Sequence, residues 1–315
     1  MMKAEVAGNR PQKTRSASLK GARFRKNLVG YLFLVPFFGL FTLFVIIPVV
    51  WSFVISFFSY DMVSSFKFVG FDNYIDLITN DALFIQAFKN TMFFAVVAGP
   101  IGFIASFFFA WIINQLKFRN AFSLAFYAPS ITSFLAISVV WLSLFSSNRV
   151  GYINNLLLEF GFISDPIGWT ADPRYIMPLL ILISVWMSMG QGFLTNLAGF
   201  SNMNEELFEA GKIDGIRNRF QELLLITLPQ MKPQLLFNAV MAIVNSLSVF
   251  EIGQAIAGFP SPDNAAHTLV GHIYDFGFIR LELGYASAVA FIILVVSLVM
   301  GQVVMKLLGE KDDNG

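Results

Sequence analysis

The chain has 315 residues, of which 56% are hydrophobic and only 13% are charged, and its formal net charge is +1. Soluble domains carry about a quarter charged residues, so this composition excludes an ordinary soluble protein and predicts one built for lipid. The near-neutral charge argues against nucleic acid as a partner. The absence of Cys excludes disulfides, thiol catalysis and zinc–thiolate sites. The two histidines, His267 and His272, are too few to suggest a metal site.

Six stretches with no charged side chain, or only one, are long enough to cross a bilayer, which takes about 20 apolar residues. They lie between Lys26 and Asp61, Lys89 and Lys117, Arg119 and Arg149, and Arg174 and Glu205, then from Pro233 past Glu251 to about Ala257, and from Leu283 to Met305. We therefore predict an all-α polytopic membrane protein with about six transmembrane helices. Its expected parts are a basic, disordered cytoplasmic tail (1–27), a transmembrane domain (28–308) and a short cytoplasmic tail (309–315).

The distribution of basic residues predicts the orientation. If the N-terminus lies in the cytoplasm and the spans alternate, most of the 21 Lys and Arg residues fall on the cytoplasmic side, as the positive-inside rule requires. Both termini should then be cytoplasmic. The first apolar stretch is too long for a signal peptide and ends without a cleavage site, so we expect a retained anchor.

The predicted outer loops are short. The first, 61–89, is expected to form an amphipathic cap near the interface, and the others cover about 147–174 and 258–282. His267 and His272 lie in the last of these and are expected to be solvated. Three prolines inside predicted spans are interpreted as helix kinks; they are Pro48, Pro100 and Pro129.

The one long inner loop, about 201–233, is the most polar part of the body. Asn204 is a plausible N-cap, followed by acidic residues in the first helical turn. Leu207, Ala210 and Gly211 share one face that lacks bulk, and Asp214-Gly215 supplies a turn. A second short helix should follow and end before Pro229. From the residues alone, this pattern is either a docking element for another protein or an amphipathic loop such as many polytopic proteins carry.

Part of this loop resembles the EAA signature of ABC importer permeases, which reads Glu-Ala-Ala, two residues, Asp-Gly-Ala and then Ile-x-Leu-Pro. The matching residues are Glu209-Ala210-Gly211, Asp214-Gly215 and the later Ile226, Leu228 and Pro229. Gly211 stands where the second Ala is usual, and Ile216 stands where an Ala often follows. Other segments resemble maltose-, lactose- and glycerol-phosphate-type permeases in order and spacing; they are Tyr31–Pro36, Gly70–Tyr74, Asn90-Thr91, Ile153–Leu157, Leu197–Gly199 and Leu283–Ala288. Ala257–Pro260 departs from the family's usual outer turn.

The resemblance implies a permease subunit of a carbohydrate importer in the bacterial cytoplasmic (inner) membrane. Its implied partners are a second homologous permease, two nucleotide-binding ATPase subunits and an extracytoplasmic solute-binding protein. The residues that would couple to the ATPase are Glu209, Ala210, Gly211, Asp214 and Gly215. The chain contains no Gly-x-x-x-x-Gly-Lys-Ser/Thr motif, so ATP and Mg²⁺ should be bound by the partner ATPase. We expect no catalytic residue and no cofactor in this chain.

Polar residues inside the predicted spans are costly in lipid and are candidates for function. Glu251 is the most prominent, and the resemblance places sugar-contacting positions near Gln191 and near Asn245, Ser246 and Val249. Trp186 and Phe250 are candidates to stack on a sugar ring. The alternative is that these side chains only hydrogen-bond between helices, an interpretation that suits Asn196 best.

Two other classes of protein are weighed against the importer. An ion-coupled secondary transporter could use Glu251 as its proton or sodium site, and a membrane-embedded enzyme would need clustered catalytic residues, which the sequence does not show. The EAA pattern favours the importer, because a secondary transporter has no need of this pattern on an inner loop.

Overall fold

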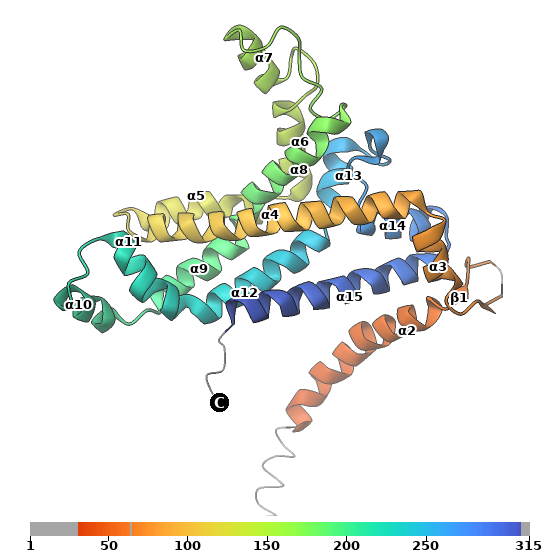
Figure 1. Ribbon diagram of the computed structural model, residues 1–315, viewed down its shortest axis with the longest axis horizontal. Helices are drawn as coiled ribbons and strands as arrows, with labels where there is room; N and C mark the ends of the chain where they lie inside the picture. The colour runs from red at the N-terminus through yellow and green to blue at the C-terminus, as the bar shows by residue number, and fades with distance from the viewer. Residues whose placement is uncertain (1–30, 64, 310–315) are drawn as a thin grey trace, which may run out of the picture. The chain divides into compact units, whose positions relative to one another are not determined.

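The computed structural model describes residues 31–63 and 65–309, and the regular structure there is almost entirely helical (Figure 1). The chain divides into two compact units after Val54. The α-helices are α2 (Ile47–Ile55), α3 (Asp72–Thr79), α4 (Ala82–Asn114), α5 (Arg119–Ile131), α6 (Phe134–Leu144), α7 (Tyr152–Glu159), α8 (Pro173–Ser188), α9 (Gln191–Ser201), α10 (Glu205–Ile213), α11 (Arg219–Glu222), α12 (Leu228–Leu247), α13 (Glu251–Ala257), α14 (Leu269–Tyr274) and α15 (Leu283–Leu308). The remaining elements are the π-helical turns η1 (Thr42–Ile46), η2 (Leu223–Thr227) and η4 (Asp275–Ile279), the 3-10 turn η3 (Pro262–Asn264), and the antiparallel strands β1 (Phe58–Ser59) and β2 (Lys67–Phe68).

The membrane-spanning segments agree with the predicted number. Among residues 31–63 and 65–309, four helices are long and apolar enough to cross a bilayer: Tyr31–Ile55, Ala82–Asn114, Pro173–Ser201 and Leu283–Leu308. Two bent pairs also qualify, α5 with α6 at 98° and the helix Arg219–Leu247 with α13 at 47°. Counted as broken spans, they bring the total to six and confirm the polytopic all-α class. The predicted tails, apart from Gly309, lie outside the described residues.

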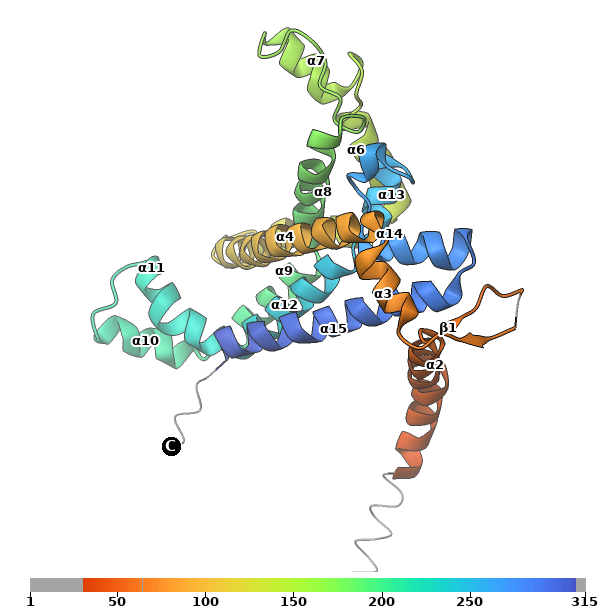
Figure 2. The same ribbon diagram turned by 45° about the vertical axis from the view of Figure 1, so that its right-hand side comes forward.

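Helix α4 is central to the second unit because its buried face is made of small side chains. It lies alongside α8, α9 and α12, and α15 in turn lies alongside α12 (Figures 1 and 2). A Cβ on Gly102 would lie 2.6 Å from Ser188 Oγ in α8, so glycine allows this approach without a shift of Ser188. Small residues at helix contacts let backbones come close where lipid supplies no hydrophobic drive. The small residues buried on this face are Ala87, Thr91, Ala95, Ala98, Gly99, Gly102, Ser106 and Ala110.

The two predicted kinks in the second unit have different outcomes. α4 continues through Pro100 for almost four further turns. α5 ends two residues after Pro129, and the chain then bends by 98° into α6. In the first unit, Pro48 is the second residue of α2 and follows directly on the π-helical turn η1.

The predicted end of a helix before Pro229 is wrong. α11 runs through η2 into α12, and Pro229 lies in the first turn of α12. In η2 the N–H of Leu228 reaches back five residues to the carbonyl of Leu223. The π turn shifts the backbone hydrogen bonds by one residue, so a proline directly after it, which has no N–H to donate, is accommodated without ending the helix. The helix therefore continues from Arg219 to Leu247.

The expectation that His267 and His272 are solvated is also wrong. Their exposed fractions are 3% and 0%. The reason is that side chains of α4 bind the backbone of the loop. The Asn90 amide donates to the carbonyl of His267 at 2.9 Å, and Thr91 Oγ1 accepts from the N–H of Leu269 at 2.9 Å. The loop 258–282 is thus packed against α4 rather than extended into solvent.

Candidate functional site

The helix α10 begins as the sequence predicts. The side chain of Asn204 accepts a hydrogen bond from the N–H of Glu206 at 3.0 Å and so caps the helix. The backbone N–H of Asn204 donates in turn to Oε1 of Gln230, in α12, at 3.1 Å. Glu205 and Glu206 occupy the first turn, where the helix dipole favours acids, and Lys212 occupies the last. The helix is therefore stabilised at both ends and attached to α12.

The turn after α10 is a Schellman motif. Gly215 has a φ of +94°, the N–H of Ile216 donates to the carbonyl of Gly211 at 2.9 Å, and the N–H of Gly215 donates to that of Lys212 at 3.3 Å. These bonds satisfy two carbonyls that a helix end would leave free. Asn218 then caps α11 by accepting from the N–H of Gln221 at 2.8 Å. The predicted helix, turn and helix are confirmed, and Asp214-Gly215 forms the turn.

The predicted bare face of α10 is only partly available to another protein. Gly211 is buried, and a Cβ on it would lie 2.7 Å from Cδ1 of Ile226 and 3.0 Å from Cδ1 of Ile216. Its small size therefore serves the packing of α10 on its own chain. Glu209, Ala210 and Asp214 are exposed, as is Gly215. Large apolar side chains are exposed beside them; these are Leu207, Ile213, Phe220, Leu224 and Leu225.

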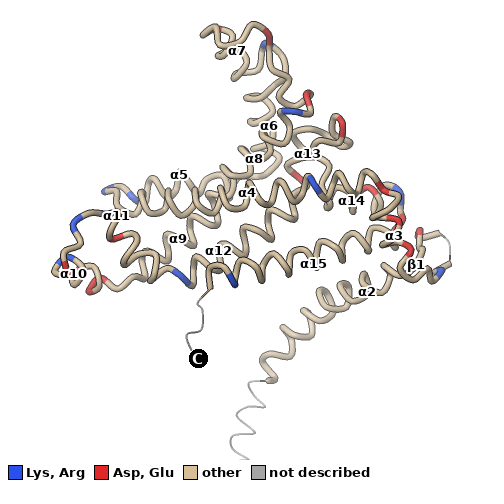
Figure 3. Tube along the Cα trace, viewed as in Figure 1, with Lys and Arg blue, Asp and Glu red and all other residues tan. Residues whose placement is uncertain are grey.

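Charged residues gather on α10 and α11 and around α3 and β1, whereas the long helices between them carry few (Figure 3). On α11, Arg219 forms an ion pair of 3.0 Å with Glu222 one turn later. A surface pair of this kind contributes at most about 1 kcal/mol. This ion pair lies next to the exposed apolar side chains. The segment α10–α11 therefore has a surface of mixed charged and apolar side chains, of the kind that binds other proteins.

The predicted substrate-pathway residues lie near the breaks in two spans. Gln191 is the first residue of α9, and Glu251 is the first residue of α13, after the bend in the α12–α13 span. Both side chains are exposed, as is Asn245 in the last turn of α12. The sequence analysis placed Glu251 inside the fifth span. In the structure it lies directly after the bend in that span.

Ser246 and Val249 face the interior. The Ser246 hydroxyl donates to the carbonyl of Ala242 at 2.7 Å. The same hydroxyl faces Gly99 in α4, where an added Cβ would lie 3.2 Å from it. Val249 packs against the core shared by α4, α8 and α13. The contacts in the described part of the chain join Ser246 to α4, but they do not bring Gln191 to Asn245 or Glu251.

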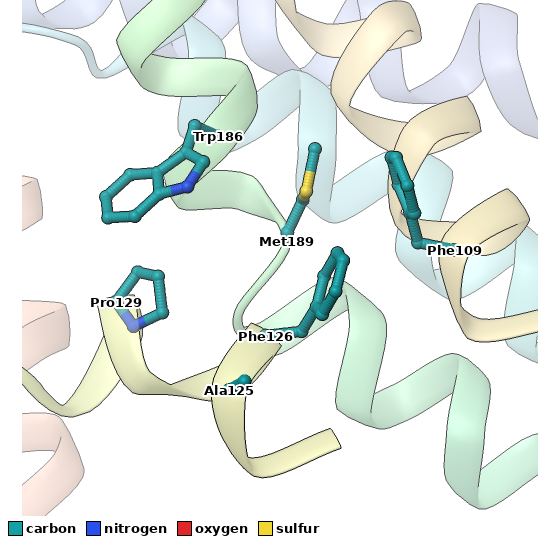
Figure 4. A pocket seen from close by; sticks show the side chains of 6 residues that line it. All are labelled: Phe109, Ala125, Phe126, Pro129, Trp186 and Met189. Atoms are coloured by element: carbon teal, nitrogen blue, oxygen red, sulfur yellow. The ribbon is translucent and has the colours of Figure 1, made fainter. Parts of the chain in front are cut away.

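An apolar cavity of about 340 Å³ lies between α4, α5 and the end of α8. Figure 4 shows the side chains of Trp186, Met189, Phe109 and Phe126 around it, with Ala125 and Pro129 completing the lining. Phe250, the other aromatic residue expected to meet a sugar, instead packs on Tyr274, with 5.1 Å between ring centroids. The two aromatic candidates therefore do not share a site within this chain.

A buried polar contact links three of the helices. The Asn238 amide donates to Oδ1 of Asn196 at 2.8 Å, and the Asn196 amide lies 3.5 Å from Oγ of Ser106. The predicted interhelical role of Asn196 is confirmed. The sequence analysis missed Asn238, although it follows Gln230 and Gln234 at intervals of four residues in a segment whose one charged residue is Lys232. That spacing is the signal that could have identified it.

The two histidines form a second polar cluster at the N-terminal end of α4, beside its N-cap residue Asp81. Nε2 of His267 lies 3.1 Å from Nδ1 of His272, and Nε2 of His272 lies 3.1 Å from Oδ2 of Asp81, although outside hydrogen-bond geometry. Asp81 also accepts from the hydroxyl of Tyr285 at 2.9 Å. Burial lowers the pKa of His267 to about 4, and burial also lowers the pKa of His272 despite the nearby carboxylate of Asp81.

Comparison with known proteins identifies the family. Residues 98–308 match the family described as "Binding-protein-dependent transport system inner membrane component". The arabinooligosaccharides transport system permease protein AraP of Bacillus subtilis is 30% identical over 97% of this chain and 96% of its own length. The lactose transport system permease protein LacF of Rhizobium radiobacter is 31% identical over 86% and 91%, and the probable ABC transporter permease protein YesP of Bacillus subtilis is 34% identical over 89% and 90%.

The fold is similar to that of a solved transporter. A chain from the crystal structure of a bacterial alginate ABC transporter in complex with alginate pentasaccharide-bound periplasmic protein matches with a TM-score of 0.78 and 24% identity, over 93% of this chain and 98% of that one. At this identity the match concerns the fold alone. Together with the match over residues 98–308, the helix–Schellman turn–helix segment and the six apolar spans, it leads to one conclusion. The chain belongs to the family of binding-protein-dependent transport system inner membrane components.

Proposed function

We propose that this chain is the membrane-spanning subunit of an ABC importer that carries a sugar, oligosaccharide or sugar phosphate across the bacterial cytoplasmic membrane. The permeases AraP and LacF are named for arabinooligosaccharides and lactose. A further relative, the sulfoquinovosyl glycerol transport system permease protein SmoG of Agrobacterium fabrum, is 26% identical over 90% of this chain. Support from the chain itself comes from Gln191, Asn245 and Glu251, which are exposed near span breaks, where polar side chains can meet a hydroxylated substrate.

The observation that carries the coupling role is the exposed end of α10 with its Schellman turn. Glu209, Ala210 and Asp214 are exposed there on a helix capped at both ends. In the proposed complex this surface docks on an ATPase subunit, with Gly211 and Gly215 shaping the segment from within. Two such ATPase subunits bind ATP and Mg²⁺, and a second homologous permease completes the pathway.

The proposed orientation places both termini and α10 in the cytoplasm. It rests on the excess of Lys and Arg that this arrangement puts on the cytoplasmic side. The loops 61–89, 147–174 and 258–282 then face outward, where an extracytoplasmic solute-binding protein delivers the substrate. ATP binding closes the ATPase pair, and α10 transmits this movement to the spans.

A secondary transporter driven by an ion at Glu251 is the alternative, and two observations count against it. The chain belongs to a binding-protein-dependent family. The Glu251 side chain is exposed, whereas an ion site in a membrane needs several converging ligands. Among residues 31–63 and 65–309, no group of three or more acidic, His or Cys side chains is arranged to hold a metal ion.

Reconstitution tests the function directly. The permease pair and the ATPase are placed in vesicles, and uptake of labelled arabinooligosaccharides and lactose is measured with the solute-binding protein present. We expect uptake to require ATP and the binding protein and to persist when an ionophore collapses ion gradients. Uptake that continues without the ATPase and stops with the ionophore would establish the secondary transporter instead.

A further inference from the structure

Gln230 and Gln234 form a polar stripe with Asn238 on the face of α12 that meets α9. The three residues are spaced four apart, so their side chains are neighbours along one side of the helix. Gln230 meets the start of α10 through the N–H of Asn204, and Asn238 meets Asn196 in α9. Between them, Gln234 lies beside Gly199, where a Cβ would be 3.6 Å from its Cγ. The stripe is therefore continuous from α10 to the middle of the bundle.

Two atoms of this stripe are buried without hydrogen-bond partners. They are Nε2 of Gln230 and Oε1 of Gln234. Because Oε1 of Gln230 accepts from the N–H of Asn204, the remaining polar atom of that amide must be the donor Nε2. An unpaired donor thus lies one helical turn from an unpaired acceptor. Buried polar atoms are rarely left unpaired, and a donor and an acceptor four residues apart on one helix face can meet after a change of side-chain rotamer.

The backbone at this point is suited to movement. The π-helical turn η2 shifts the hydrogen-bond register just before Pro229, and Pro233 withholds another backbone donor one turn later. Single π turns inside α-helices often occur at functional sites, and an interrupted ladder permits a change of helix direction. The segment that carries Gln230 therefore lacks part of the regular backbone hydrogen bonding of the long helix.

We propose that Gln230 is a positioning residue that exchanges between two partners during transport. In the arrangement described here it holds the N–H of Asn204 and attaches α10 to α12. In the other arrangement it releases Asn204, and its Nε2 donates to Oε1 of Gln234, which lets α10 move relative to α12. The two glutamines thereby set the coupling between ATP hydrolysis and the spans. This inference rests on the proposed function.

Two substitutions separate the partners of Gln230. Gln234→Met removes the second acceptor and keeps the Asn204 contact, whereas Gln230→Met removes both contacts at nearly constant volume. Gln115→Met is the matched control, because Gln115 is an exposed glutamine at the end of α4, far along the chain from this stripe. Nitroxide labels on Lys212→Cys and Phe237→Cys, both exposed positions, report the distance between α10 and α12. The chain has no other Cys to interfere.

In the assembled transporter, we expect two label distances whose proportions change when ATP binds. In Gln234→Met the attached arrangement should persist with ATP, and uptake and hydrolysis should fall together by about tenfold. In Gln230→Met hydrolysis should continue while uptake per ATP hydrolysed falls by about fivefold or more. Gln115→Met should behave as the wild type. A merely structural role would lower the amount of assembled complex without changing uptake per ATP.

The inference is overturned if the wild type shows a single distance in both nucleotide states, or if Gln234→Met and Gln230→Met both match Gln115→Met. If Gln230→Met does not assemble, Gln234→Met carries the test alone, because it keeps the contact between Gln230 and Asn204. A wild-type transporter without ATP-driven uptake would instead contradict the proposed function.

Discussion

Gly215 and Gly211 are only four residues apart, but glycine suits the structure at the two positions for different reasons. At Gly215 the backbone adopts a φ of +94°, which residues with a Cβ rarely adopt. At Gly211 the backbone is helical, and it is the approach of Ile226 and Ile216 that leaves no room. A substitution at Gly215 therefore alters the direction of the turn, whereas one at Gly211 alters the packing beneath α10.

Replacing Gly215 with Val should misdirect the turn and weaken ATPase binding. A Cβ in this region costs about 1–2 kcal/mol, and Asn tolerates it best among the other residues. We therefore expect Gly215→Val to lose most ATPase in a pull-down with purified permease and Gly215→Asn to retain most of it. Gly168→Ala is the control, because a Cβ there meets only ordinary contacts from 3.5 Å. Equal ATPase binding by all three variants would mean that this turn does not shape the docking surface.

At Gly211, two opposing effects can be separated. Ala favours a helix by about 1 kcal/mol relative to Gly, but its Cβ would press on Cδ1 of Ile226. Ile226→Val removes that atom. We expect the double variant to unfold at a higher temperature than either single variant. Additive shifts in the unfolding temperature would show that the two side chains do not meet.

The buried histidines predict a pH dependence of stability. An unfolded His titrates near 6.5, whereas the pKa of His267 in the folded chain is about 4. Between these values the unfolded chain binds more protons, so the stability must fall as the pH falls, by up to about 1.4 kcal/mol per pH unit for this residue. We expect the unfolding temperature of the detergent-solubilised protein to drop over this range and His267→Gln to reduce the drop. An unchanged slope in that variant would show that His267 is not the group responsible.

At the scale of the elements, a helix was predictable wherever its position depends on a run of hydrophobic residues or on a capping residue. Asn204, Asp214 and Gly215 show the start of α10 and its turn, because capping chemistry is local. The continuity of α12 through Pro229 was not predictable, since it depends on the π turn η2 before it. The burial of His267 likewise depends on side chains of α4 that lie far away in the sequence. Contacts of this kind leave no local pattern.

The residues at the breaks in the spans can be tested for a role in transport. Gln191 and Glu251 each begin a helix after a break, with exposed side chains, so neither should be needed for the fold. We expect Gln191→Ala and Glu251→Ala to reduce uptake at least about threefold while leaving complex assembly and basal ATP hydrolysis intact. Asn196→Ala is the contrasting control, because it breaks a buried contact and should lower the unfolding temperature. Normal uptake in both pathway variants would remove these residues from the substrate route.

At the scale of the whole molecule, composition predicted the class, and the positions of the stretches without charge predicted the number of spans. The substrate-pathway residues were harder to place, because the contacts of a single chain do not join Gln191, Asn245 and Glu251. These side chains are exposed near breaks, and a second permease is the proposed partner on that surface. A site shared between chains cannot be completed from the packing of one of them.

The orientation is tested by labelling single cysteines in intact cells. Ser201, Arg119, Ser65 and Asp263 are all exposed, so accessibility will depend on the side of the membrane and not on burial. We expect cysteines at Ser201 and Arg119 to react only with reagents that cross the membrane, and those at Ser65 and Asp263 to react with impermeant ones. Labelling of position 201 by an impermeant reagent would reverse the assigned sides.

The unbroken run of α12 past Pro229 gives the molecule a lever arm. Its 20 residues extend over about 30 Å, so a tilt of about 5° at the end near α10 would displace the other end by about 2.6 Å. That end leads directly into the bend before Glu251. A small rotation at the end near α10 would therefore reach the bend before Glu251 as a displacement comparable to the length of a hydrogen bond, enough to make or release a contact with one hydroxyl group.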